Sequence, residues 1–258
     1  MKAFAVIGYH HSGKTTVVTS LVKALTEKGY KVATIKDIHN EDYRVDTEGK
    51  NTWQHIQAGA VMTFARGLHD SALIFPQPLS LKEMTALIQC DYLIIEGMKS
   101  APVPKILCAE SAEQLEELYD DTVFAVSGKL ANGKTEWQEP PLLDVATDLD
   151  KLTDLVEKKV FDLLPDSDPD CCSACGLNCY EMVKAILKGE RLRTDCKTDS
   201  AQQVSLAIDG KPVVIVPFVQ NLLKDVLLGF ISNLKDINPQ GNIKIEITQH
   251  DRQDSSPL

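Results

Sequence analysis

The 258-residue sequence has no uninterrupted apolar run that approaches the roughly 18–20 residues needed to cross a bilayer. The apolar run near its start is only about five residues long and leads directly into a glycine- and lysine-containing loop, so it is not typical of a signal segment. The net charge is -10, and no cluster of lysine and arginine stands out. We therefore expect a cytoplasmic protein that does not associate with membranes and whose surface repels nucleic acid.

Arginine is also scarce. The five arginines are scattered, and no segment carries the paired arginines of a lid that closes over a phosphate donor; they are Arg44, Arg66, Arg191, Arg193 and Arg252. Phosphate-binding α/β folds host many phosphotransferases. The missing lid makes a small-molecule kinase the least favoured of the possible functions.

Short apolar runs alternate with amphipathic segments through much of the chain. The predicted helix Thr16–Lys28 joins the apolar runs Lys2–Ile7 and Lys31–Ile35, which makes the β–α–β crossover of a parallel sheet. The alternation predicts an α/β fold with a mostly parallel sheet flanked by helices. Further strands are expected at Ala60–Arg66, Ala72–Phe75, Tyr92–Ile95, Lys105–Ala109 and Thr122–Val126, and further helices at Thr52–Ala58, Leu79–Gln89, Ala112–Tyr119 and Asp150–Leu164.

A segment rich in proline and aspartate, just before Cys171, marks a change in composition that is typical of a domain boundary. We expect a phosphate-loop domain at 1–164, a linker at 165–170, a small α+β domain at 171–248 and a disordered tail at 249–258. The small domain is predicted to contain the helix Cys179–Lys188, a hairpin of 203–208 and 212–217, the helix Val219–Leu234 and the strand Ile243–Ile247. The apolar stripe of Val219–Leu234 indicates core or dimer packing.

The segment Gly8–Thr15, GYHHSGKT, matches the phosphate-loop pattern GxxxxGK[ST] and lies between a predicted strand and a predicted helix. Its glycines let backbone N–H groups turn inward around an anion, and the start of the helix adds a partial positive charge. Lys14 would bridge the outer phosphates of a nucleoside triphosphate, and the Thr15 hydroxyl would ligate Mg²⁺. The candidate nucleotide contacts are Gly8, His11, Ser12, Gly13, Lys14, Thr15 and Thr16.

Acidic residues at the ends of predicted strands are the candidates for holding Mg²⁺ or positioning the attacking water. Asp37 follows one strand and Glu96 ends another, where α/β sheets place ligands. Asp46 is a weaker candidate. We expect His10 and His11 to point outward rather than act as a base. The segment Ala125–Lys129, where a base-reading loop would lie, has no aspartate, so the sequence alone does not choose between GTP and ATP.

Seven cysteines form the second chemical motif. An odd number with five members close together does not fit a secreted disulfide framework and favours metal or redox chemistry. Cys172, Cys175, Cys179 and Cys196 could hold a [4Fe–4S] cluster or a tetrahedral Zn²⁺, or remain unmetallated thiols. The segment CGLNCYEMVKAILKGE resembles a small four-cysteine iron–sulfur module, with one residue fewer between the second and third cysteines. That shortening leaves open whether Cys171 or Cys172 supplies the first ligand, whereas Cys90 and Cys108 are expected in the core.

GYHHSGKTT, the segment Ile35–Ala60 and the segment Leu93–Ile106 together resemble the molybdopterin-guanine dinucleotide biosynthesis protein B family, over roughly residues 1–160. The resemblance implies a SIMIBI-class phosphate-loop protein that binds GTP and Mg²⁺, hydrolyses GTP weakly and often dimerises. It also implies that Glu96 is the acid of the second nucleotide motif, with Asp46, Lys50, Lys99 and Lys105 on the same face. The family's histidine-rich stretch is replaced here by Lys36-Asp37-Ile38-His39-Asn40. This difference makes Asp37 a stronger candidate for holding Mg²⁺ or positioning the attacking water.

These observations lead to one functional hypothesis and one main rival. The first is a weakly hydrolysing GTP-binding accessory protein in molybdenum or tungsten cofactor maturation, in which Lys14, Asp37 and Glu96 are the catalytic candidates. Its expected partner is a molybdopterin guanylyltransferase or a molybdopterin-bearing protein, and we expect a homodimer. The rival is an adaptor that hydrolyses nothing and whose nucleotide state switches its affinity for a partner enzyme.

Overall fold

The structure is a computed structural model that describes residues 1–132, 139–165, 175–197, 204, 206–208, 211–213, 217–234, 243 and 245. It divides into two compact units, Met1–Ser200 and Ala201–Leu258. Within the described ranges, no helix combines the length and the apolar character that a membrane span requires.

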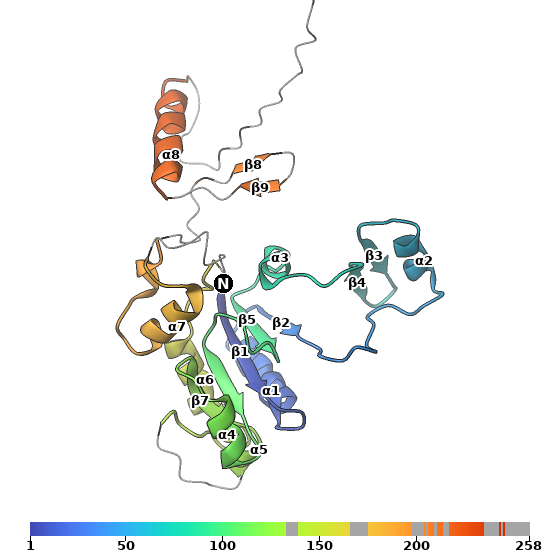
Figure 1. Ribbon diagram of the computed structural model, residues 1–258, viewed down its shortest axis with the longest axis vertical. Helices are drawn as coiled ribbons and strands as arrows, with labels where there is room; N and C mark the ends of the chain where they lie inside the picture. Colours follow the sequence, from blue (N-terminus) through green and yellow to red (C-terminus); the bar gives the residue numbers. More distant parts are fainter. Residues whose placement is uncertain are drawn as a thin grey trace, which may run out of the picture. The chain divides into compact units, whose positions relative to one another are not determined.

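The first unit is built on a five-stranded parallel sheet with the strand order β2-β5-β1-β6-β7 (Figure 1). The chain first leaves the central strand β1 toward one edge of the sheet and later continues to the other edge. Such a reversal leaves a crevice at the carboxyl ends of the strands, where open α/β sheets bind ligands. The strands are β1 (Lys2–Gly8), β2 (Val32–Lys36), β5 (Tyr92–Glu96), β6 (Lys105–Cys108) and β7 (Val123–Ser127).

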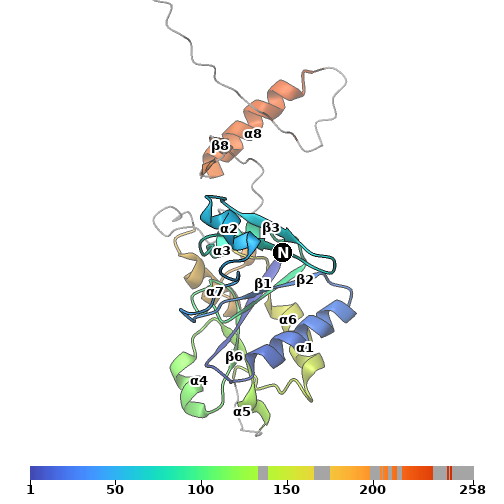
Figure 2. The same ribbon diagram turned by 90° about the vertical axis from the view of Figure 1, so that its right-hand side faces the viewer.

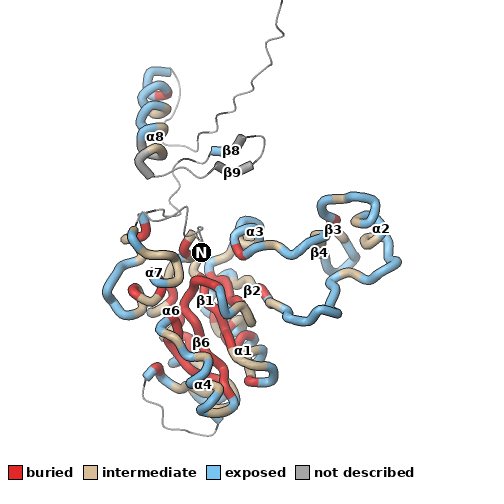
Figure 3. The backbone as a smooth tube through the Cα atoms, in the orientation of Figure 1, coloured by how far each residue is buried: buried red, intermediate tan, exposed pale blue. Residues whose placement is uncertain are grey.

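Helices cover both faces of this sheet, so the central strands are buried on both sides (Figure 3). In β1, Phe4 and Val6 contribute to one hydrophobic cluster, and Ala5 and Ile7 contribute to the other. Figure 2 shows α1 and α6 on one side of β1 and α4 on the opposite side. The helices of this layer are α1 (Lys14–Glu27), α3 (Leu81–Ala86), α4 (Ala112–Leu118), α5 (Lys129–Asn132) and α6 (Leu149–Lys159). The predicted α/β fold is confirmed.

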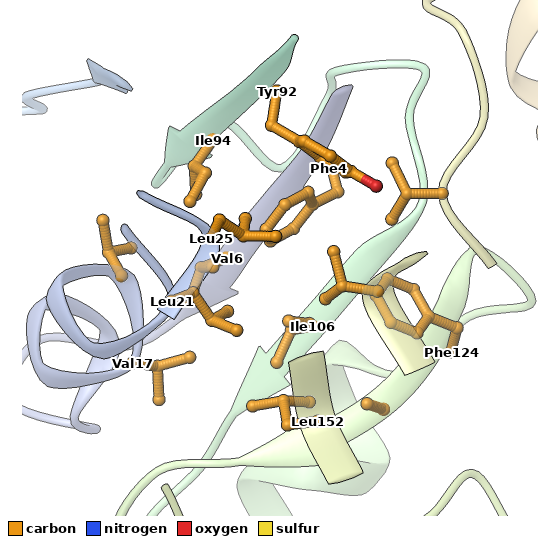
Figure 4. Close-up of a cluster of buried hydrophobic side chains, with 14 of the residues drawn as sticks. Phe4, Val6, Val17, Leu21, Leu25, Tyr92, Ile94, Ile106, Phe124 and Leu152 are labelled. Carbon is orange, nitrogen blue, oxygen red and sulfur yellow. The ribbon is translucent and has the colours of Figure 1, made fainter. Parts of the chain in front are cut away.

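The spacing of apolar residues explains how α1 packs on the sheet. Val17, Leu21 and Leu25 repeat every four residues, so they share one helix face, and none of the three is exposed (Figure 4). They meet Phe4, which packs edge-to-face on Phe124 with ring centroids 6.5 Å apart. Each such buried side chain contributes about 1.5–3 kcal/mol, so the packing fixes the start of α1 at the end of β1.

The segment between β2 and α3 forms an arm that does not join the main sheet. Among the described strands, β3 (Thr63–Arg66) and β4 (Ser71–Ile74) pair only with each other, in an antiparallel hairpin, and α2 (Asn51–Gln57) lies beside β3. The three elements match the predicted helix and strands, but nothing in the sequence pattern indicates a separate hairpin. Most of the apolar side chains of the arm are exposed, among them Val61, Met62, Phe64 and Leu68.

Helix α7 (Cys179–Leu187) belongs to the first unit and packs on it. Met182, Val183 and Cys196 share a hydrophobic cluster with Leu164, which follows the last helix of the α/β layer. The short 3₁₀ helix Arg193–Asp195 precedes Cys196. The described part of the cysteine segment thus contacts the α/β layer, while the division of domains at 164–171 stays a prediction.

In the second unit, β8 (Leu206–Ile208) and β9 (Lys211–Val213) form an antiparallel hairpin, and α8 (Pro217–Ile231) follows. These elements match the predicted hairpin and helix. The predicted strand Ile243–Ile247 falls mostly outside the described residues, and so does the predicted tail.

Candidate functional site

The loop from Gly8 to Thr15 joins β1 to α1 at the carboxyl edge of the sheet. Gly8 and Gly13 have φ values of +146° and +98°, which an L side chain rarely adopts. A Cβ atom on Gly8 would also lie 2.1 Å from the carbonyl oxygen of Cys108 on β6. Both glycines are therefore required by the backbone path, and this path turns the loop around the start of α1.

A second loop packs against this one from the end of β7. The Lys129 N–H donates to the Ser12 carbonyl at 3.1 Å, and a Cβ atom on Gly128 would lie 2.2 Å from that same oxygen. The sequence suggested only a role in base recognition for this segment. The position of Gly128 directly after the buried strand β7 was the sequence feature that could have indicated a close approach to the phosphate loop.

Lys14 lies in the loop as the phosphate-binding pattern requires. Its ammonium donates to the carbonyl oxygen of Tyr9 at 2.6 Å, within the same loop. Burial lowers the pKa of Lys14, and the positive charges of Lys36 and Lys99 act in the same direction. An anion bound in the loop would therefore be attracted by a partly desolvated cation.

Thr15, Glu96 and Lys36 meet at one carboxylate oxygen. The Thr15 hydroxyl donates to Oε1 of Glu96 at 2.8 Å, and the Lys36 ammonium lies 3.1 Å from the same oxygen. Glu96 ends β5 and is buried, and Lys36 ends the neighbouring strand β2. The hydroxyl and the carboxylate are hard oxygen donors of the kind that Mg²⁺ prefers, so their chemistry fits this ion.

Asp37 lies beside this group. Its backbone N–H donates to the Glu96 carbonyl at 2.8 Å, and its carboxylate Oδ2 lies 2.9 Å from Nε2 of His39. The structure therefore places Asp37 at the carboxyl edge of the sheet, as its position after β2 predicts. The pairing with His39 was not predicted.

These residues surround a cavity of about 660 Å³. Its walls carry four lysines and two carboxylates, so the cavity is positive in a chain whose net charge is -10. Lys99 additionally lies over the Tyr9 ring, 4.7 Å from its centroid. The charged lining residues are Lys14, Lys36, Lys99, Lys129, Asp37 and Glu96, and the loop residues Gly8, His10, His11, Gly13, Thr15 and Thr16 also line it. The arrangement fits a polyphosphate.

Three residues expected on this face lie elsewhere. Asp46 and Lys50 belong to the segment that leads into the arm, where Asp46 accepts hydrogen bonds from the Thr47 N–H and the Thr52 hydroxyl. Ser12 is fully buried beneath the loop rather than lining the cavity. Position in the phosphate-loop motif, as for Ser12, or in a family segment, as for Asp46 and Lys50, does not by itself place a side chain at the cavity.

Lys105 corrects another expectation, because it lies at the opposite edge of the sheet. It is the first residue of β6, whereas Cys108, the last residue of the strand, lies beside Gly8. Its buried ammonium donates to the Tyr180 hydroxyl of α7 at 2.6 Å, and that hydroxyl donates to Asp120 at 2.6 Å. Burial lowers the pKa of Lys105 to about 8.

The described cysteines fall into two groups. In the first, Cys90 is half-buried and packs against the core. Cys108 is buried at the end of β6, and burial raises its pKa to about 12, so its thiol stays neutral, as expected of a core residue. In the second, Cys196 belongs to the hydrophobic cluster of α7 and Cys175 and Cys179 pack against it, whereas Cys172 lies outside the described residues. Within the described part of the chain, no three histidine, cysteine or acidic side chains are placed to hold a metal ion.

Comparison with known proteins gives consistent matches. The family model "Molybdopterin guanine dinucleotide synthesis protein B" matches residues 3–129, which include the loop, Asp37, Glu96 and Lys129. A Methanocaldococcus jannaschii protein, provisionally named as a molybdopterin-guanine dinucleotide biosynthesis adapter protein, is 28% identical over 96% of this chain and 97% of its own.

Two further matches cover about half of the chain or somewhat more. The molybdopterin-guanine dinucleotide biosynthesis adapter protein of Haemophilus influenzae is 33% identical over 47% of this chain and 71% of its own length. The crystal structure of Bacillus subtilis MobB, at 28% identity, covers 61% of this chain and 97% of its own with a TM-score of 0.51. The chain belongs to the molybdopterin-guanine dinucleotide biosynthesis protein B family.

Proposed function

We propose that this chain binds GTP with Mg²⁺ and serves as an accessory protein in the biosynthesis of molybdopterin guanine dinucleotide. The relatives' names give them the role of adapter proteins in this pathway. The observation that carries the nucleotide assignment is the positive cavity around the glycine-shaped loop, with Lys14 at its base.

The residues that would hold Mg²⁺ are Thr15 and Glu96, whose side-chain oxygens already lie within hydrogen-bonding distance. When bound, the ion would neutralise charge on the outer phosphates. Asp37 lies next to this pair and is the candidate for orienting a water molecule. Lys14 and the loop amides would stabilise the charge that develops on the transferred phosphoryl group.

Hydrolysis by the isolated chain is expected to be slow, because no arginine lines the described cavity. In many GTPases an arginine supplied in the same chain or by a partner accelerates hydrolysis by 10³–10⁵. A guanylyltransferase partner, or a molybdopterin-bearing protein, would supply such an arginine.

Lys14→Ala tests the nucleotide assignment. The variant should bind GTP at least about 100-fold more weakly than the wild type, because the partly buried ammonium makes charge-assisted contacts with phosphate. Isothermal titration calorimetry with GTP and Mg²⁺ measures the loss. Wild-type protein that binds no GTP, or a Lys14→Ala variant with normal affinity, would contradict the proposal.

A switched adaptor without hydrolysis is the alternative. A weak GTPase and a non-hydrolysing adaptor would both bind GTP, so a binding measurement does not distinguish the two functions. Phosphate release over multiple turnovers, measured with the guanylyltransferase partner present, does: sustained release supports the weak GTPase, and none supports the adaptor.

We also propose a homodimer in which the arm contributes to the contact. Phe64 on β3 is 69% exposed, and Leu68 in the hairpin turn is 98% exposed. Exposed apolar side chains grouped on one hairpin are typical of an interaction surface. Light scattering on the intact chain measures its mass, and a monomer at all concentrations would contradict the dimer.

The cysteine segment remains the site proposed for an iron–sulfur cluster, with zinc as the alternative. The proposal is supported by the spacing of the cysteines in the sequence and by the affinity of soft thiolates for either metal, and not by the placement of the described Cys175, Cys179 and Cys196, which do not group around a metal position. Protein purified without oxygen should contain about four irons per chain with matching sulfide. Stoichiometric zinc would favour the zinc site, and the absence of both iron and zinc would contradict the proposal of a metal site.

A further inference from the structure

Lys36 has a position that the nucleotide motif does not explain. Its ammonium is paired with the Glu96 oxygen that accepts the Thr15 hydroxyl. Those two partners are the side chains proposed to hold Mg²⁺. The Lys36 ammonium therefore lies beside the Glu96 oxygen that a bound Mg²⁺ would also approach.

The two members of this ion pair differ in their freedom to move. The Glu96 side chain is 10% exposed, whereas the Lys36 side chain is 56% exposed at the end of the edge strand β2. A lysine has a long flexible stem, so its ammonium can leave the pair while Glu96 stays in place. Lys36 also lines the cavity together with Lys14, Lys99 and Lys129, so another anion in the cavity would be available to it.

We propose that Lys36 is a residue that recognises the terminal phosphate of the nucleotide and is released for this contact when Mg²⁺ takes Glu96 and Thr15. The inference rests on the proposed function. In the arrangement that the structure shows, Glu96 neutralises Lys36. With metal and triphosphate bound, the carboxylate faces the ion, and the added negative charge of the third phosphate attracts the ammonium.

The position of Lys36 gives this exchange a consequence outside the phosphate site. A second cavity of about 620 Å³, between α1 and β2, shares Thr15, Lys36 and Glu96 with the first. These three residues are the wall between the two cavities. Movement of Lys36 therefore changes the surface beside β2 according to the nucleotide that is bound.

The test compares Lys36→Ala with Lys31→Ala, which removes the same charge from the residue just before the opposite end of β2. Calorimetry measures the affinities for a non-hydrolysable GTP analogue and for GDP, each with saturating Mg²⁺ and again with a chelator. Loss of one charge-assisted contact predicts about 10- to 100-fold weaker binding of the triphosphate with Mg²⁺. GDP affinity should stay within about twofold, and Lys36→Arg should recover part of the loss.

The metal dependence separates recognition from a general effect of charge. Without Mg²⁺ the wild-type ammonium stays on Glu96, so Lys36→Ala should then change triphosphate affinity by less than about threefold. Equal losses for the triphosphate and GDP, equal losses with and without metal, or no loss at all would overturn the inference. Wild-type protein without any GTP binding would instead overturn the proposed function, and the inference with it.

Discussion

Replacing Gly128 with alanine is expected to weaken GTP binding by at least about 100-fold, although Gly128 lies outside the phosphate-loop motif. Its φ is +83°, and a new Cβ atom would lie 2.2 Å from the Ser12 carbonyl oxygen and 3.0 Å from Cβ of Cys108. The oxygen belongs to the backbone of the phosphate loop, and Cys108 is fixed in the core. The added methyl group therefore has to displace the loop, and the backbone amides that surround the phosphates would move with it.

Gly29→Ala is the matched control for this substitution. Gly29 has a similar φ of +92°, but a Cβ atom there meets nothing within 4 Å. Both variants bear the strain of a left-handed alanine, about 1–2 kcal/mol, and only Gly128→Ala adds a collision with the loop. Calorimetry should show near-normal GTP affinity for Gly29→Ala. Equal affinities for the two variants would mean that the two loops do not depend on each other.

The sequence predicts the phosphate loop and its strand–helix context because the motif depends on local backbone geometry. A glycine that must adopt positive φ and a lysine one residue later are recognisable without the rest of the fold. Asp37 and Glu96 are also predictable, because residues that end parallel strands gather at one edge of the sheet. The contact of Gly128 with Ser12 joins residues more than a hundred positions apart, so it depends on the order of the strands.

Lys105 shows where a resemblance without geometry misleads. It stands close to the glutamate motif in the sequence, which suggested a place on the nucleotide face. Yet it begins β6, and the first residue of a parallel strand lies at the edge away from the carboxyl ends. The direction of the predicted strand was enough to reject the expectation. The arm was not predictable in the same way, because its short strands have the same residue preferences whether they join the main sheet or pair alone.

The buried Lys105 has a second consequence, a stability that rises with pH between about 8 and 10.5. Burial lowers its pKa to about 8 in the folded chain, the charge of Asp120 opposes this effect, and Lys184 reinforces it. In the unfolded chain the pKa is near the ordinary value of 10.5. Between these values the unfolded chain holds a proton that the folded chain has lost, so raising the pH favours folding, in total by about 3 kcal/mol.

Tyr180 limits this effect at higher pH. Burial and its hydrogen bond to Asp120 raise its pKa to about 12, above the ordinary value of 10.0. The folded chain therefore keeps the phenol proton that the unfolded chain loses, and stability falls as the pH rises from 10 through 12. Measurements at pH 8, 9 and 10 stay below most of this opposing change.

Lys105→Met isolates the contribution of the ammonium, because it keeps an unbranched side chain of similar length without the charge. From pH 8 to 10 the free energy of unfolding of the wild type should rise by about 2 kcal/mol relative to that of the variant. Urea unfolding followed by circular dichroism measures the free energy of unfolding of both proteins.

Lys184→Met is the control. It removes the ammonium of a half-buried lysine, 5.2 Å from the Tyr180 ring, and should keep most of the rise in stability. If Lys105→Met showed the same pH dependence as the wild type, the ammonium would not lose its proton in this range. A confirmed difference would show that the ammonium that joins β6 to Tyr180 of α7 loses its proton in this range. At the other end of that strand, Cys108 lies beside Gly8 of the phosphate loop and Gly128 of the loop that packs against it.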